Sequence, residues 1–168
     1  VRISDAQTRD QDNNIIYSEL ILTTPGEISF GSSLDSTYSG VSDLVIRGLS
    51  GIHLTDDVGV ISPFHAVTFD GPIKLYDALT INTADGDLHF ASSIDSDLTA
   101  NTRALTLNAG TGNITLNDSI GFINPLGAIE FNSSVVFERA SSCYADCNLF
   151  VIASNHPITF NASVDDSA

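Results

Sequence analysis

Several residue types are rare or missing in this chain of 168 residues, and each shortage narrows the range of functions. Methionine and tryptophan are absent, and lysine plus arginine number 6 against 21 aspartates and glutamates, for a net charge of −15. A nucleic-acid-binding surface needs a basic footprint, which this composition does not supply. Binding to an anionic membrane surface is disfavoured for the same reason, whereas an acidic surface suits surroundings rich in salt or divalent cations.

The sequence also lacks any apolar run long enough to span a bilayer, and it shows no signal-peptide pattern. No initiator methionine is present. We therefore expect a processed chain or an excerpt from a longer one, with any secretion signal or membrane anchor outside these residues.

Cysteine is scarce, with Cys143 and Cys147 as its two representatives. Two cysteines so close in the sequence do not make a zinc site, because no further histidine or cysteine stands at zinc-binding spacing nearby. A local disulfide that closes a turn is the favoured interpretation, and two free thiols in a loop are the alternative. A disulfide would fit an oxidising, extracellular compartment.

What the chain does contain is typical of β structure. Hydrophobic residues make up 42 % of it. They recur at spacing two in short runs, separated by Gly, Asp, Asn, Ser and Pro, and no stretch has a helical period. This pattern predicts an all-β fold. Residues between the apolar pairs, such as His53, His89, Thr115 and Glu130, are expected to face solvent.

One strand-and-turn phrase occurs three times in the sequence. The copies occupy residues 26–36 (GEISFGSSLDS), 86–96 (GDLHFASSIDS) and 157–167 (PITFNASVDDS). Internal repetition of this kind indicates a repeat protein. If the copies are structurally equivalent, Phe30, Phe90 and Phe160 occupy equivalent buried positions.

The repetition suggests one β-repeat domain over residues 20–168, preceded by a polar lead-in over residues 1–19. Super-repeats of about 60 residues are expected at 20–78 and 79–148, with a partial third at 149–168. The lead-in has little apolar periodicity and is expected to be a solvated connector.

Shorter spacings within each super-repeat suggest how it folds. Similar strands begin at Leu20 and Leu44 in the first super-repeat, and at Leu79 and Leu105 in the second. Short strands that recur every 20–30 residues, roughly, suggest the coils of a β-solenoid, in which each coil completes its core by stacking on its neighbours. A β-sandwich built from the same strands is the alternative.

Residues 105–137, LTLNAGTGNITLNDSIGFINPLGAIEFNSSVVF, combine a Leu-Thr-x-Asn strand, an Ala-Gly-x-Gly turn, a hydrophobic-Gly step and a Pro-Leu loop. This combination resembles the repeats of filamentous-haemagglutinin-like and autotransporter-like bacterial surface adhesins. The resemblance covers about residues 20–137 and resumes at Leu149. It implies a right-handed parallel β-helix that acts as a rigid stalk or adhesive surface outside the cell. The segment 141–147 departs from that family, whose members are usually poor in cysteine.

Catalysis would need paired carboxylates, or a carboxylate beside a basic residue, at a fixed separation. The basic residues are spread along the chain, and no catalytic triad or nucleotide-binding fingerprint is present. We therefore expect no enzymatic activity and no cofactor. Asp35, Asp95 and Asp165 recur in the repeated phrase and are interpreted as turn residues that bond their own turn. As the alternative, a column of these carboxylates would bind calcium.

Together these observations predict a secreted or cell-surface module with a structural and adhesive role. Its expected partners are other copies of itself or neighbouring repeats, with glycans or proteins of a host surface as possible ligands. The alternative is a subunit of a self-assembling extracellular filament, in which unpaired strand edges recruit the next chain.

Overall fold

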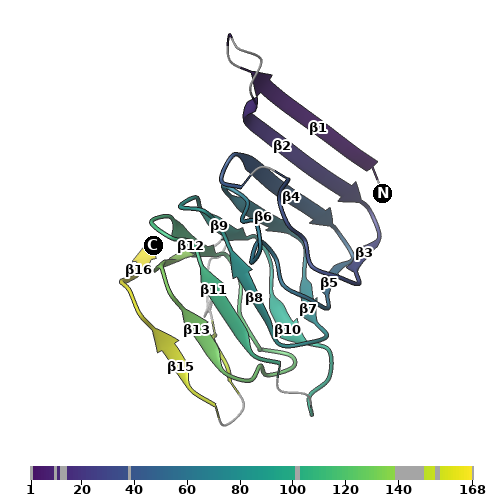
Figure 1. Ribbon diagram of the computed structural model, residues 1–168. Helices are drawn as coiled ribbons and strands as arrows, with labels where there is room; N and C mark the ends of the chain where they lie inside the picture. Colours follow the sequence, from purple (N-terminus) through teal and green to yellow (C-terminus); the bar gives the residue numbers. More distant parts are fainter. Residues whose placement is uncertain are drawn as a thin grey trace.

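The computed structural model describes residues 2–9, 11, 15–37, 39–100, 103–138, 150–153 and 156–167. This part of the chain is all-β, and its short strands wind around one axis in successive coils (Figure 1). The fold is a parallel β-helix, as the sequence predicted, and not a β-sandwich. The described residues contain no helix of the length and hydrophobicity needed to cross a membrane.

The largest of three sheets, sheet A, has eight strands in the order β1-β2-β4-β6-β9-β12-β14-β16. Its strands pair in parallel except for β1, which runs antiparallel to β2. Their bounds are β1 (Arg2–Arg9), β2 (Ile15–Thr24), β4 (Ser42–Gly48), β6 (Val67–Asp70), β9 (Leu88–Phe90), β12 (Asn113–Leu116), β14 (Ser134–Glu138) and β16 (Val164–Ser167).

Sheets B and C form the other two faces and have four parallel strands each. Sheet B contains β3 (Glu27–Phe30), β5 (Gly51–Leu54), β7 (Ile73–Leu75) and β10 (Ile94–Ser96). Sheet C contains β8 (Leu79–Asn82), β11 (Leu105–Asn108), β13 (Ile129–Phe131) and β15 (Ile158–Phe160). Isolated bridges continue both ladders beyond the named strands, as at Leu34, Val58 and Ile120.

The core is a set of inward-facing ladders in which each apolar side chain lies on its counterpart one coil away. In sheet A the ladder runs through Leu20, Leu44, Val67, Leu88, Ile114, Val135 and Val164. The Phe69 and Phe90 rings stack with centroids 5.3 Å apart, and neither side chain is exposed. Parallel pairing in register makes this possible, because it places identical strand positions directly above one another.

The register confirms the short spacings read from the sequence. Leu20 pairs with Leu44, and Leu79 pairs with Leu105, so each of these intervals is one coil. The alternation of inward and outward side chains is confirmed as well. In β9, for example, Leu88 and Phe90 are fully buried while His89 between them is half-buried on the outer face.

The super-repeats expected at 20–78 and 79–148 are not structural units, and the equivalence predicted from them is wrong. Phe30 lies in β3 of sheet B, Phe90 in β9 of sheet A and Phe160 in β15 of sheet C. Phe30 is half-buried, Phe90 is fully buried and Phe160 is 39 % exposed. The interval from Phe30 to Phe90 exceeds two coils but falls short of three, so the copies of the phrase fall on different faces.

The segment expected as a connector, residues 1–19, is a β-hairpin for most of its length. Arg2–Arg9 form β1, which pairs antiparallel with β2 from Arg2 opposite Thr23 to Arg9 opposite Ile15. Its polar sequence gives no period-two signal, so the pairing of its backbone with the long strand β2 was not predicted. In Figure 1 this hairpin forms one end of the stack.

Replacing Phe90 and Phe160 tests the conclusion that these two phenylalanines do not occupy equivalent buried positions. Phe90→Ala removes a fully buried ring and is expected to lower the free energy of unfolding by about 3–5 kcal/mol. Phe160→Ala is expected to cost less, because its ring is already 39 % exposed. Urea unfolding followed by circular dichroism measures both, and equal losses would restore the equivalence of the two positions.

Candidate functional site

Aspartates join consecutive coils through their side chains. Several of the described aspartates accept a backbone N–H from the coil that follows: Asp35, Asp43, Asp57, Asp85, Asp87 and Asp95. A carboxylate oxygen that accepts a backbone N–H forms a charge-assisted hydrogen bond, which is stronger than a neutral one. Part of the acidic composition therefore has a structural use between coils.

Asp35 and Asp95 do this in the same way at two different corners. Asp35 Oδ1 accepts the N–H groups of Ile61 and Ser62 at 2.9 and 3.1 Å. Asp95 is 5 % exposed, and its Oδ1 accepts the N–H groups of Ile123 and Asn124, also at 2.9 and 3.1 Å. Their interpretation as residues that bond their own turn is wrong, because each bonds a loop one coil away.

Each of these loops begins with a glycine that packs against the next coil. Gly59 and Gly121 have φ values of 69° and 70°, a region that side chains other than glycine rarely adopt. An added Cβ would lie 2.1 Å from the Asn82 carbonyl oxygen at Gly59 and 2.3 Å from the Ile152 carbonyl oxygen at Gly121.

The aspartates and glycines together hold the two loops so that apolar side chains face solvent. Ile61 is 84 % exposed and Ile123 is 71 % exposed. Phe122, which is 60 % exposed, stacks on Phe150 of the following coil with ring centroids 5.3 Å apart.

The three aspartates named as calcium candidates do not form a column. Asp35 follows the sheet C bridge at Leu34, Asp95 lies in β10 of sheet B, and Asp165 lies in β16 of sheet A beside Val136. Among the described residues, no three His, Cys, Asp or Glu side chains gather closely enough to hold a metal ion. Calcium binding by Asp35, Asp95 or Asp165 stays a prediction.

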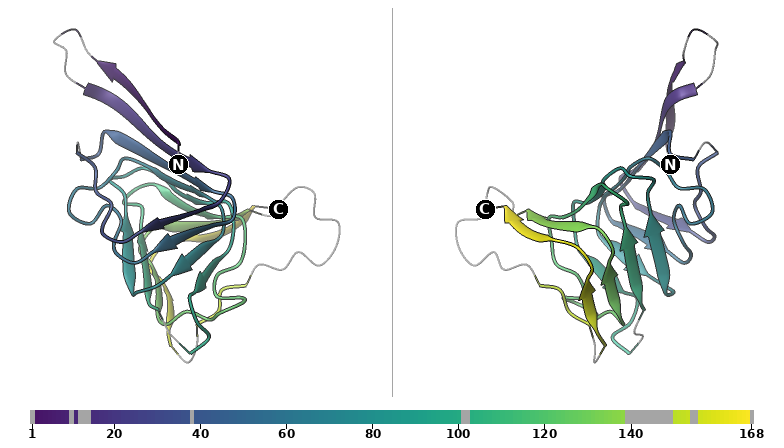
Figure 2. Two further views of the ribbon diagram at one scale, coloured as in Figure 1. Left: turned by 90° about the vertical axis from the view of Figure 1, so that its right-hand side faces the viewer. Right: turned by 60° about the vertical axis from the view of Figure 1, so that its left-hand side comes forward.

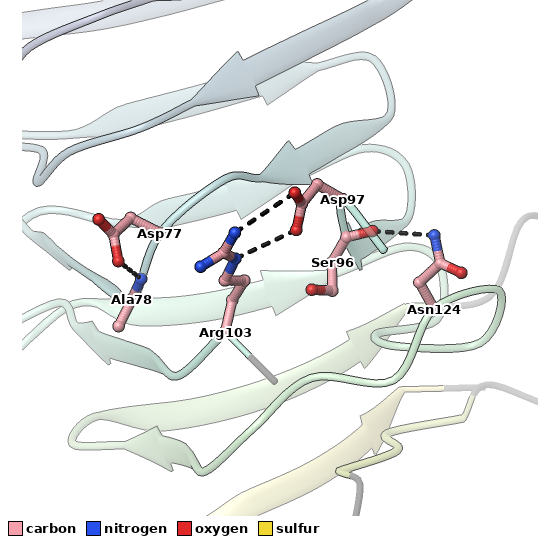
Figure 3. Close-up of polar contacts among 6 residues, drawn as sticks. All are labelled: Asp77, Ala78, Ser96, Asp97, Arg103 and Asn124. Carbon is pink, nitrogen blue, oxygen red and sulfur yellow. Dashed lines mark hydrogen bonds and ion pairs between the residues drawn. The ribbon is translucent and has the colours of Figure 1, made fainter. Parts of the chain in front are cut away.

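An ion pair holds the corner between β10 and β11 (Figure 3). Arg103 Nε lies 3.1 Å from Asp97 Oδ1, and its Nη2 lies 3.3 Å from Oδ2, so the contact is bidentate. The hydrogen bond to Asp97, helped by the negative charges of Asp97 and Asp77 and opposed by desolvation, raises the pKa of Arg103 above its ordinary value. Arg103 is charged at physiological pH, and its ion pair with Asp97 stabilises the corner between β10 and β11.

A shallow hollow of about 390 Å³ lies on the outer face of sheet A. It is lined by Ala66, Thr68, Asp87, His89, Thr115 and Glu138. Thr68, His89 and Thr115 are consecutive rungs of one outward column, because Thr68 pairs with His89 and His89 with Thr115. His89 Nε2 lies 3.0 Å from Asn117 Oδ1, and Asp87 Oδ1 accepts the Asn113 N–H at 2.8 Å.

Strands β15 and β16 form the C-terminal end of the coil stack (Figure 2), and core positions in them are exposed. Ile158 is 37 % exposed, and Val164 is 50 % exposed. Their partners one coil earlier, Ile129 and Val135, are each 1 % exposed. The Phe160 ring stacks on Phe131 at 4.7 Å and lies 39 % exposed at this end.

The predicted disulfide partners, Cys143 and Cys147, lie outside the described residues. Their pairing therefore stays a prediction, as does the absence of catalysis.

These features define the class of the molecule: a parallel β-helix with aspartate-linked coils and exposed core positions at its C-terminal end. Comparison of the chain with protein-family models, curated proteins and solved structures finds no match. The class therefore rests on strand pairing in the structure, and the resemblance to bacterial surface adhesins stays a prediction.

Sequence reasoning missed the contacts between coils, although a signal for them exists. Asp35 precedes Ile61 by 26 residues and Asp95 precedes Ile123 by 28, which is close to one coil in each case. The hollow and the open end have no such signal, because each depends on which face a strand occupies.

Removing one inter-coil aspartate tests its role. Asp95→Ala leaves the N–H groups of Ile123 and Asn124 without their acceptor, and we expect a loss of about 1–3 kcal/mol in stability. Hydrogen exchange at these two amides should accelerate. Asp56→Ala is the matched control, because Asp56 is exposed and its Oδ1 accepts the N–H of the adjacent Asp57. Unchanged exchange at Ile123 in D95A would contradict the role.

Proposed function

We propose that this chain is a structural segment of an extracellular stalk or adhesive surface, and that further parallel coils continue it at the C-terminal end. The observation that carries the proposal is the exposure of core positions there. Ile158, Phe160 and Val164 occupy the same ladder positions as side chains that are 0–1 % exposed one coil earlier. A following coil would bury them in the same way.

The aspartate pattern supports the same direction of growth. Asp35 and Asp95 follow an inward apolar residue and accept N–H groups from the next coil. Asp165 likewise follows an inward residue, Val164, and it is exposed at the end of the stack. In a longer stack, Asp165 would be placed to accept N–H groups from an added coil.

A stacked core also suits a mechanical role. Each coil contacts its neighbours along three ladders, so bending the rod separates packed side chains on one face. The outward positions carry none of this packing and are available for contacts with a surface. The resemblance to bacterial surface adhesins agrees with this division between an apolar core and a variable polar exterior.

The alternative role, a subunit of a self-assembling filament, is favoured by one feature. β16 (Val164–Ser167) is the last strand of sheet A, so its outer edge has no partner strand in the described part of the chain. An unpaired strand edge is a template for another chain. In this case the coils that complete the open end come from a second molecule.

Electron microscopy of the isolated chain separates the two roles. A segment of a longer stalk is expected to give discrete short rods at all concentrations, whereas a filament subunit gives longer particles as concentration rises. Phe160→Glu places a charge on the exposed end and is expected to abolish any such growth. Thr106→Ala on the outer face of β11 is the control and should leave it unchanged. Growth that persists in F160E would exclude the open end as the joining surface.

A further inference from the structure

We propose that the hollow on the outer face of sheet A binds a cationic oligosaccharide, that is, a short run of amino sugars with free amines. The inference deepens the adhesive part of the proposed function and rests on it. It starts from the lining, because two of its residues, Asp87 and Glu138, carry carboxylates and none carries a lysine or arginine side chain. In a molecule of net charge −15, such a hollow repels anions and attracts cations.

The positions of the two carboxylates favour an extended ligand over a single ion. Asp87 precedes Leu88, which pairs with Ile114, and Asn113 pairs with Ser134. Glu138 is therefore two strands away from Asp87 across the sheet, and it lies further along the strand direction by the length of β14. These offsets correspond to backbone positions about 16 Å apart. A ligand that meets both carboxylates thus carries positive groups at separate places along its length.

The residues between the carboxylates favour a ligand rich in hydroxyl groups. Thr68 and Thr115 each provide a hydroxyl that donates and accepts. His89 Nε2–H donates to Asn117 Oδ1 at 3.0 Å, so in the neutral ring Nδ1 is the acceptor. Sugar hydroxyls fit this mixture of donors and acceptors, whereas the methylene groups of a linear polyamine would leave it unpaired.

Existing hydrogen bonds hold part of the lining in place before a ligand arrives. Asp87 is fixed by the Asn113 N–H at 2.8 Å and His89 by Asn117. The column of Thr68, His89 and Thr115 lies on paired strands of the sheet. Binding therefore orders few side chains, which reduces its entropic cost.

Nuclear magnetic resonance titration of the whole chain with a glucosamine tetramer tests the proposal. We expect shift changes centred on Thr68, His89 and Thr115, and binding that weakens as salt is added. The double variant Asp87→Asn, Glu138→Gln keeps the acceptor that holds Asn113 but removes both charges. Its affinity is expected to fall by about tenfold or more, since hydrogen bonds between charged groups are the strong ones.

The matched control is the double variant Asp56→Asn, Asp77→Asn. It removes the same net charge at exposed turns where each aspartate accepts the backbone N–H of the next residue, outside the hollow. An equal loss of affinity in this control would overturn the proposal, because the general field of the protein would then explain binding. Equal binding of the N-acetylated tetramer, or of spermidine at the same residues, would overturn the assignment to a cationic sugar.

These outcomes are independent of the stalk proposal. The Phe160→Glu experiment reads the shape and growth of particles, whereas the titration reads ligand contacts on the outer face of sheet A. Short rods without tetramer binding would leave the structural role in place and remove the ligand. Binding at the hollow by a chain that forms filaments would do the opposite.

Discussion

In-register stacking of apolar side chains between coils is the constraint on which the other features depend. Leu44, Val67 and Leu88 are buried only because each has a counterpart above and below it. A single coil has no interior of its own, so burial is shared between neighbours. The same rule makes the last coil incomplete and leaves Val164 half exposed at the end of the ladder.

Aspartate solves a problem that this stacking creates at the corners. Strands pair along the sheets, but the loops between sheets leave N–H groups without a ladder partner. Asp35 and Asp95 satisfy two such groups each from one coil away. The arrangement needs a short acceptor side chain and no cation, which agrees with a chain that has many aspartates and few lysines.

The sequence was sufficient for most strands and for the coil length, but not for β1 (Arg2–Arg9) or for the face that each strand occupies. Alternation predicted that Leu88 and Phe90 point inward and His89 outward, and the Leu20–Leu44 spacing matched one coil. Similarity between the three copies of the repeated phrase led to a wrong prediction of structural equivalence, because strands of all three sheets need the same inward apolar pair. The sequence pattern therefore indicates which residues of a strand point inward, but not which sheet the strand joins. Contacts that depend on the face, such as the hollow and the open end, were beyond the pattern.

Net charge and stacking act against each other at the open end, and their balance decides what can complete it. Packing another coil on the end is favourable because it would bury the exposed side chains of Ile158, Phe160 and Val164. Two chains of charge −15, however, repel one another at low ionic strength. A coil supplied by the same polypeptide avoids the translational cost of association, and its own charge is the only repulsion added. A second molecule faces both the translational cost of association and the full charge repulsion. Salt screens the charge repulsion and leaves the translational cost unchanged. Growth of particles as ionic strength rises would therefore indicate that a separate chain completes the open end.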